Sequence, residues 1–131
     1  AFYAESEDDE PIWPMIKLLQ FCWWAEEGNI ILLTGRNECS REATEAWLER
    51  YDVHYDELIM RNLQDRRCAA AVKEYKLRKH NITPEKVYTI FDDDLSVVYH
   101  LRGLGYHVCD VAGGNYETRI QPLCDSIKER A

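Results

Sequence analysis

Short apolar runs that alternate with helical patterns most constrain how this chain can fold. Residues 30–33 form an unbroken apolar run, and strands are also expected over residues 58–60, 87–91 and 106–111. Unbroken runs of this kind are typical of strands buried on both faces of a parallel sheet. Helical patterns fill the intervals between them, so the sequence predicts an α/β fold with a mainly parallel sheet in a three-layer sandwich.

Helical spacing of the apolar residues predicts helices over residues 14–28, 40–51, 68–79 and 96–104. Ser40 is the expected N-cap of the second helix, and Gly105 is the expected stop after the fourth. Residues 34–37 are expected to form a loop after the first strand. The third helix is expected to carry a basic outer face, formed by Lys73, Lys76, Arg78 and Lys79.

Composition limits the classes of function. The 131 residues are 46% hydrophobic and 31% charged, which indicates a globular domain with one sizeable core. A net charge of -8 argues against a protein that wraps nucleic acid with a broad basic face, although it allows local recognition of one phosphate. Five dispersed cysteines with no Cys-x-x-Cys pair favour reduced thiols and a cytoplasmic location. The sequence shows no signal peptide and no membrane-spanning apolar stretch.

Three groups of polar residues suit phosphate chemistry. Thr34-Gly35-Arg36 follows the first strand and offers a hydroxyl, a flexible backbone and a planar guanidinium. Lys73 lies early in the third helix, where its ammonium group can neutralise a bound phosphate. Asp92-Asp93-Asp94 follows the strand over residues 87–91, and such a carboxylate cluster either holds a cation such as Mg²⁺ or forms a solvated turn whose aspartates cap a helix.

The order of these groups resembles the haloacid dehalogenase (HAD) superfamily of phosphohydrolases, whose fold is a Rossmann-like sandwich. More narrowly, residues 1–116 resemble the 3′-phosphatase domain of bacteriophage polynucleotide kinase, which leaves residues 117–131 as a C-terminal extension with a short helix. Further matching segments are Pro11-Ile12-Trp13-Pro14, Thr44-Glu45-Ala46-Trp47-Leu48, Leu58-Ile59-Met60-Arg61, Val72-Lys73-Glu74, Val97-Val98, Leu104-Gly105 and Val111-Ala112-Gly113-Gly114-Asn115-Tyr116.

The resemblance implies a Mg²⁺-dependent phosphohydrolase that removes a phosphate from a nucleic-acid 3′ end or a nucleotide. In the family an aspartate attacks phosphorus, water hydrolyses the aspartyl-phosphate, and a second aspartate two residues later acts as general acid and base. Mapped here, Thr34 would hold the phosphoryl group and Lys73 would stabilise its charge. Asp92 and Asp93 would hold Mg²⁺. The residues that would contact the substrate are Gly35, Arg36 and Arg61.

One departure from the family is that Asp-x-Asp-Gly, the motif that carries the nucleophile, occurs nowhere in this sequence. The resemblance implies that the strand bearing it lies between the strands that end at Thr34 and at Asp92. Without it, two strands would face a gap with unpaired backbone groups. The preferred explanation is a longer polypeptide whose upstream segment completes the sheet. A second chain that completes it, or a rearranged and inactive relative, are the other two.

Two rival interpretations belong to other classes of protein. A catalytically inactive HAD-like protein would work by binding a partner or in regulation, and its interaction surface would draw on Trp13, Trp23, Trp24 and Trp47. A response-regulator receiver domain also combines a parallel sheet with an acidic pocket, a threonine and a lysine. In receiver domains, however, the acidic pair comes early and the lysine last, whereas the order here is Thr34, Lys73 and then Asp92-Asp93.

Overall fold

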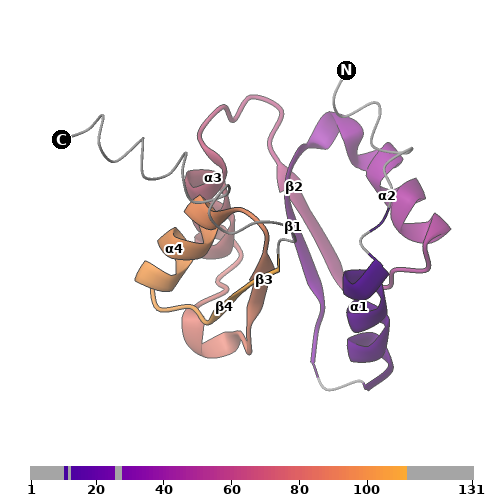
Figure 1. Ribbon diagram of the computed structural model, residues 1–131. Helices are drawn as coiled ribbons and strands as arrows, with labels where there is room; N and C mark the ends of the chain where they lie inside the picture. The colour runs from indigo at the N-terminus through magenta and orange to yellow at the C-terminus, as the bar shows by residue number, and fades with distance from the viewer. Residues whose placement is uncertain (1–10, 12, 26–27, 112–131) are drawn as a thin grey trace. The chain divides into compact units, whose positions relative to one another are not determined.

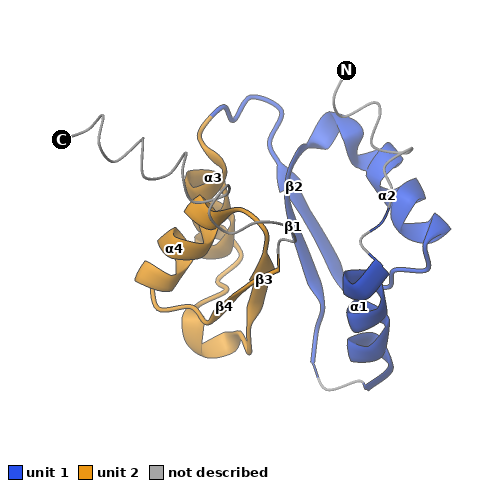
Figure 2. Cartoon of the chain, viewed as in Figure 1, with its two compact units in different colours: residues 1–66 blue, residues 67–131 orange. Residues whose placement is uncertain are grey.

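The computed structural model describes residues 11, 13–25 and 28–111 (Figure 1). The chain divides into two compact units, Ala1–Arg66 and Arg67–Ala131 (Figure 2). Each unit contains one pair of parallel strands and two α-helices in its described part. Within these described ranges, none of the helices combines the length and apolarity needed to cross a membrane.

The first unit is built on β1 (Ile31–Asn37) and β2 (Glu57–Arg61), which run parallel. Helix α1 (Trp13–Ala25) precedes β1, and the 3-10 helix η2 (Glu38–Ser40) leads into α2 (Arg41–Arg50). Both α-helices lie on the same side of the strand pair (Figure 1). This arrangement follows from the alternation of apolar side chains along β2, which presents one set of them to the helices.

The core of the first unit joins these helices to the strands. Ile16 of α1, Leu48 of α2 and Leu58 and Met60 of β2 form one buried cluster with Val53. Burial of each such side chain is worth about 2 kcal/mol. Outside this cluster, Trp13 and Tyr51 meet edge to face with ring centroids 5.7 Å apart, so α1 is also anchored to the end of α2.

The second unit is built on β3 (Ile90–Asp92) and β4 (Val108–Asp110), which are also parallel, with Asp92 aligned to Asp110. Helix α3 (Ala69–Lys79) is followed by the 3-10 helix η3 (Pro84–Lys86), and α4 (Leu95–Gly103) lies between the two strands in sequence. Helix α4 packs against both strands and against α3. Its inner face is fully buried at Val97, Val98 and Leu101.

Three helices end in the same way. After α4, the N–H of Gly105 donates to the carbonyl of Arg102, and the N–H of Tyr106 donates to the carbonyl of Leu101. Gly105 has a φ of 100°, which completes a Schellman motif. Helices α2 and α3 repeat this pattern with Asp52 and Asn81 at the left-handed position. In each case a leucine near the helix end and an apolar residue after the turn close the motif; the pairs are Leu48 with Val53, Leu77 with Ile82, and Leu101 with Tyr106.

The predicted α/β class with parallel strands is confirmed. In the described part of the chain, β1 pairs only with β2 and β3 only with β4, so β1 and β3 each keep one edge without a partner strand there. The predicted C-terminal helix lies outside the described residues.

Several local predictions were wrong. The last strand is β4 over residues 108–110, which is shorter than the predicted 106–111. Residues 34–37 continue β1 because Asn37 aligns with Arg61 of β2. Residues 87–89 precede β3, because alignment with the short β4 limits the strand to residues 90–92. Ser40 makes no side-chain cap; its hydroxyl donates to the carbonyl of Asn37 instead. Lys73 and Lys76 do not belong to a basic outer face of α3, because the side chain of Lys73 is 13% exposed and Lys76 is only 5% exposed.

Candidate functional site

A bulge in β1 presents Thr34, Gly35 and Arg36. Leu33 aligns with Ile59, and the next aligned pair is Asn37 with Arg61, so four steps along β1 match two steps along β2. The two extra residues push this segment out of the regular ladder. Inside the bulge, the N–H of Arg36 donates to Oγ1 of Thr34 over 3.1 Å. A hydroxyl that accepts this bond still carries its own O–H, which can donate to a phosphoryl oxygen.

The carbonyl of Gly35 is held by the side chain of Arg61. Nε of Arg61 donates to this carbonyl over 2.9 Å, and Nη1 donates to the carbonyl of Asp65 over 3.3 Å. A Cβ added at Gly35 would lie 3.7 Å from Nη2 of Arg61, which is ordinary van der Waals contact. Glycine at this position is therefore not required by the space inside the unit.

Lys73 and Asp92 form a buried ion pair in the second unit. Nζ of Lys73 lies 2.6 Å from Oδ2 of Asp92, and the two side chains are 13% and 7% exposed. Helix α3 supplies the lysine, and the carboxyl end of β3 supplies the aspartate. Such a pair is retained only when its geometry repays the loss of hydration, so it marks a site where both charges are held in place.

The other aspartates of the triplet differ in their roles. The N–H of Asp94 donates to Oδ1 of Asp92 over 3.0 Å. Asp94 in turn caps α4, because its Oδ1 accepts from the N–H and the hydroxyl of Ser96. Of the two interpretations of the triplet, the capping one therefore applies to Asp94. Asp93 is exposed and adjoins the buried Asp92.

The donor set of this triplet suits Mg²⁺ in part. Carboxylate oxygens are hard ligands, and Mg²⁺ takes few protein ligands while keeping several waters. Each oxygen of Asp92 accepts one bond, from Lys73 or from Asp94, and each has a second lone pair. Among the residues that the structure describes, no group of three or more His, Cys, Asp and Glu side chains is placed to hold a metal ion. The carboxylates of Asp92 and Asp93, completed by water molecules, are therefore the ligands that this site could offer to Mg²⁺.

The predicted site residues fall in both units. The first unit holds Thr34, Gly35, Arg36 and Arg61 within or beside the bulge, and the second holds Lys73, Asp92 and Asp93. The role of Asn37 was missed from sequence. Its side chain accepts from the N–H of Cys39 over 3.0 Å and donates to the carbonyl of Leu63 over 3.1 Å. An asparagine immediately before a helical turn is the signal that could have revealed it.

Solved structures contain chains similar to this one. A chain in the Pnkp1/Rnl/Hen1 RNA repair complex is 28% identical, with a TM-score of 0.77, and the match covers 87% of this chain and 37% of that chain. A chain in another structure of the Pnkp1/Rnl/Hen1 complex is also 28% identical, with a TM-score of 0.75, and the match covers 84% of this chain and 38% of that one. The present chain thus spans less than two-fifths of the length of either. No curated protein matches it.

A protein-family model gives the most specific match. Residues 2–116 match the model of the polynucleotide kinase PNKP phosphatase domain, which is a HAD-type domain. The match includes the β1 bulge, the Lys73–Asp92 pair and the cap at Asp94. This chain therefore belongs to the family of polynucleotide kinase phosphatase domains.

Proposed function

We propose that this chain contributes to a phosphatase that removes a phosphate from a nucleic-acid 3′ end or a nucleotide. Residues 1–116 form its phosphatase domain, and residues 117–131 are an extension. The observation that carries the proposal is the buried ion pair between Lys73 and Asp92 at the end of β3. In a chain of this family, a fixed lysine at a strand end suits the stabilisation of a phosphoryl group.

The β1 bulge supplies the second part of the proposal. The hydroxyl of Thr34 would donate to a phosphoryl oxygen, since its acceptor side is taken by the N–H of Arg36. Gly35 would allow a phosphate to approach the backbone closely. Arg36 would bind a phosphate of the nucleotide with two hydrogen bonds. Arg61 would steady the substrate directly or through Gly35.

Lys73 and the first two aspartates would act on charge. The ammonium group of Lys73 has three donors, of which one meets Asp92, so it can also donate to a phosphoryl oxygen. Asp92 and Asp93 would hold Mg²⁺, directly or through water. When bound, the ion would neutralise charge on the phosphate. Asp94 would keep its role as the cap of α4.

A further segment or chain would supply the nucleophile. The sequence contains no Asp-x-Asp-Gly, while β1 and β3 each keep an edge without a partner in the described residues. We propose that a strand from upstream residues or a second chain carries the nucleophile and pairs with such an edge. The similar solved chains come from Pnkp1/Rnl/Hen1 complexes, which supports a protein partner in RNA repair. The intact mass of the natural protein separates the two cases, because only a mass well above 15.4 kDa indicates an upstream segment.

Phosphate binding tests the proposal on this chain. Wild type and variants would be titrated with inorganic phosphate in the presence of Mg²⁺, with amide resonances as the readout. Lys73→Ala is expected to abolish binding, whereas Lys79→Ala, on the same helix and exposed, should bind like wild type. Lys73→Arg keeps the positive charge. It serves as a second variant in case Lys73→Ala loses phosphate binding only because it unfolds. A phosphate affinity in Lys73→Ala equal to that of wild type would contradict the proposal that Lys73 binds phosphate.

Activity on nucleic-acid ends tests the substrate class. The natural protein is expected to release phosphate from an oligonucleotide with a 3′-phosphate, and to leave the same oligonucleotide with a 5′-phosphate intact. The release should need Mg²⁺ and should disappear in the presence of a chelator. Equal release from both ends, or release from neither, would contradict the proposed substrate class.

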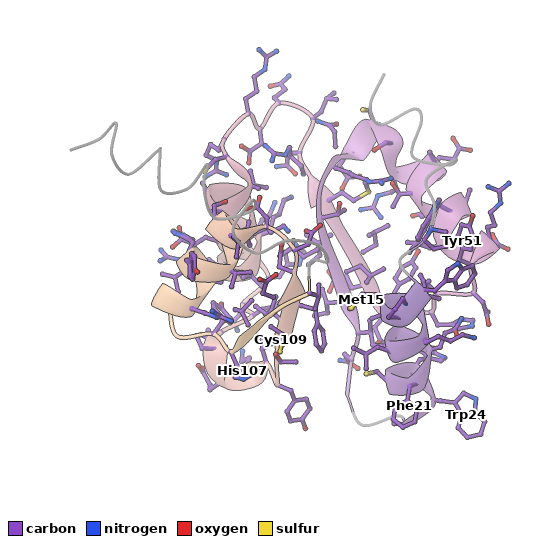
Figure 3. All side chains as sticks on the ribbon, viewed as in Figure 1. Met15, Phe21, Trp24, Tyr51, His107 and Cys109 are labelled. Atoms are coloured by element: carbon purple, nitrogen blue, oxygen red, sulfur yellow. The ribbon has the colours of Figure 1, made fainter. Side chains whose placement is uncertain are left out.

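A second candidate function is partner binding without catalysis. Phe21 and Trp24 are 74% and 87% exposed and project away from α1 (Figure 3). They border a shallow apolar depression with Lys17, Gln20 and Ala25. A chain that binds phosphate weakly, and whose natural protein releases none, would favour this interpretation.

A further inference from the structure

The loop that follows β2 is tied to the β1 bulge by side chains from both strands. From β2, Arg61 bonds to the carbonyls of Gly35 and Asp65. From β1, Nδ2 of Asn37 donates to the carbonyl of Leu63 over 3.1 Å and approaches that of Asn62 at 3.4 Å. Arg61 and Asn37 are themselves aligned across the two strands. Four backbone carbonyls are therefore bound by two side chains at one end of the strand pair.

These bonds restrain a segment that the strand ladder does not hold. Between Leu33 and Asn37 no residue of β1 is aligned with β2, so the ladder leaves the position of residues 34–36 open. The bond from the N–H of Arg36 to Oγ1 of Thr34 restrains the shape of the segment internally. The bond from Arg61 to the carbonyl of Gly35 attaches its middle to β2. Removal of that bond would take away this attachment of the bulge to β2.

The geometry of Arg61 favours a positioning role over direct contact with phosphate. Its Nε and Nη1 donate in two directions, to a carbonyl of the bulge and to a carbonyl of the following loop. The rigid planar guanidinium can span two such acceptors at once, whereas the single ammonium group of lysine forms a point contact. An arginine whose task is to bind phosphate would direct this fork at the ligand.

We infer that Arg61 and Asn37 are positioning residues, which hold the Thr34–Gly35–Arg36 segment and residues 62–65 as one preformed phosphate-binding surface. The inference rests on the proposed phosphate binding by that segment, and it gives Arg61 and Asn37 the role of holding the segment in place. Preorganisation of this kind lowers the ordering cost of ligand binding. Arg61 then acts through the backbone of Gly35, in place of the direct substrate contact expected from sequence.

The experiment measures backbone position and phosphate affinity on the same samples. Amide spectra of the whole chain would be recorded for wild type, Arg61→Ala, Arg61→Lys and Asn37→Ala, each titrated with inorganic phosphate. Arg50→Ala is the matched control. Arg50 is an exposed arginine at the end of α2, and its replacement removes the same charge as Arg61→Ala does. Melting temperatures recorded in parallel would show that each variant is folded.

The inference predicts linked changes in the two readouts. Arg61→Ala should shift the Gly35 and Arg36 amide resonances before phosphate is added and should weaken phosphate binding about tenfold, the effect of one charge-assisted hydrogen bond. Arg61→Lys should restore only part of both. Asn37→Ala should shift the resonances of residues 62–64 and weaken binding less. Arg50→Ala should change neither readout.

Other outcomes overturn the inference in distinguishable ways. Weaker binding in Arg61→Ala with unshifted Gly35 and Arg36 resonances would mean that Arg61 contacts phosphate directly, which keeps the proposed function and rejects the positioning role. Shifted resonances with unchanged affinity would reject any effect of the support on binding. Wild-type resonances and wild-type phosphate affinity in Arg61→Lys would show that simultaneous bonds from the guanidinium to the carbonyls of Gly35 and Asp65 are not needed. Absence of phosphate binding in wild type would reject the proposed function itself.

Discussion

Lys73 and Asp92 are joined by an ion pair of 2.6 Å between side chains that are 13% and 7% exposed. The pair links helix α3 to the carboxyl end of β3, while the other oxygen of Asp92 accepts from the N–H of Asp94. One carboxylate thus connects the lysine to the start of α4. A change to either partner should affect both the stability of the second unit and its capacity to bind phosphate.

Removal of Lys73 alone should cost more stability than removal of both charges. Lys73→Met leaves the carboxylate of Asp92 buried without its cation, which should cost about 3 kcal/mol. Lys73→Met combined with Asp92→Asn removes both charges of the pair and keeps an oxygen for the N–H of Asp94. Urea unfolding of the four proteins in this cycle measures the coupling. A double variant whose loss of stability equals the sum of the two single losses would show that the pair is not coupled in solution.

Mg²⁺ binding should depend on Asp93 and not on Asp94. Asp93→Asn removes the charge of an exposed carboxylate next to Asp92 and should abolish Mg²⁺ binding measured by calorimetry. Asp94→Asn is the matched control, because asparagine caps a helix as well as aspartate does. Equal Mg²⁺ affinity in wild type and Asp93→Asn would refute the metal assignment.

Gly35→Ala should lower phosphate affinity without lowering the stability of the fold. The added Cβ meets Nη2 of Arg61 at 3.7 Å, an ordinary contact, so the melting temperature should stay within a few degrees of wild type. Phosphate affinity should fall if the ligand approaches this backbone, since a methyl group would stand in the way. Unchanged affinity, measured in the same titration as for Lys73→Ala, would mean that Gly35 is not a contact residue.

Two glycines near the end of α4 should respond to alanine with opposite signs. Gly105 has a φ of 100° in the Schellman turn, so Gly105→Ala should cost about 1 kcal/mol. A Cβ at Gly103, the last residue of α4, meets nothing within 4 Å, so Gly103→Ala should stabilise by roughly 0.5 kcal/mol. Chemical denaturation gives both values. A destabilised Gly103→Ala would show that the end of α4 is not helical in solution.

Tyr106 should make stability fall at alkaline pH. Burial raises the pKa of Tyr106 above its usual value, so the folded chain holds the phenolic proton more tightly than the unfolded chain does. Its contribution is therefore complete below about pH 10 and is lost as the pH rises through that value towards the folded pKa. Tyr106→Phe should lower stability at neutral pH by about 1 kcal/mol, because the carbonyl of Ile82 loses its donor.

The alkaline range distinguishes burial of the phenol from general charge effects. Between about pH 9 and 11, the free energy of unfolding of Tyr106→Phe should decline less steeply than that of wild type. Tyr88→Phe is the control, since Tyr88 is 88% exposed. Parallel declines for wild type and Tyr106→Phe would show that Tyr106 titrates alike in the folded and unfolded chains.

Much of the fold could be predicted from local patterns. The runs at residues 58–60 and 108–110 contain buried strand residues, and the glycine at position 105 ends its helix as expected. The ends of α2 and α3 could also have been predicted. Leu48 and Leu77 each precede Asp or Asn by four residues and an apolar residue by five, which is the sequence signature of the same turn.

The two errors in strand bounds at residues 34–37 and 87–89 share a physical cause, because each depends on a partner strand distant in sequence. Thr34 to Asn37 has the composition of a turn, and only its alignment with Arg61 makes it a strand. Lys76 follows the pattern of a solvated helix face, yet it is only 5% exposed. The buried pair of Lys73 with Asp92 joins residues 19 positions apart, and no local pattern reveals such a distance.

The bulge in β1 also has a consequence for how such a chain can diverge. Its two extra residues are taken up between two aligned pairs, Leu33 with Ile59 and Asn37 with Arg61. The strand regains its alignment afterwards, so the chain enters η2 and α2 from the same place whatever residues 34–36 are. Substitutions in this segment can accumulate without rebuilding the core, and a descendant can acquire a new ligand preference while it inherits the scaffold unchanged.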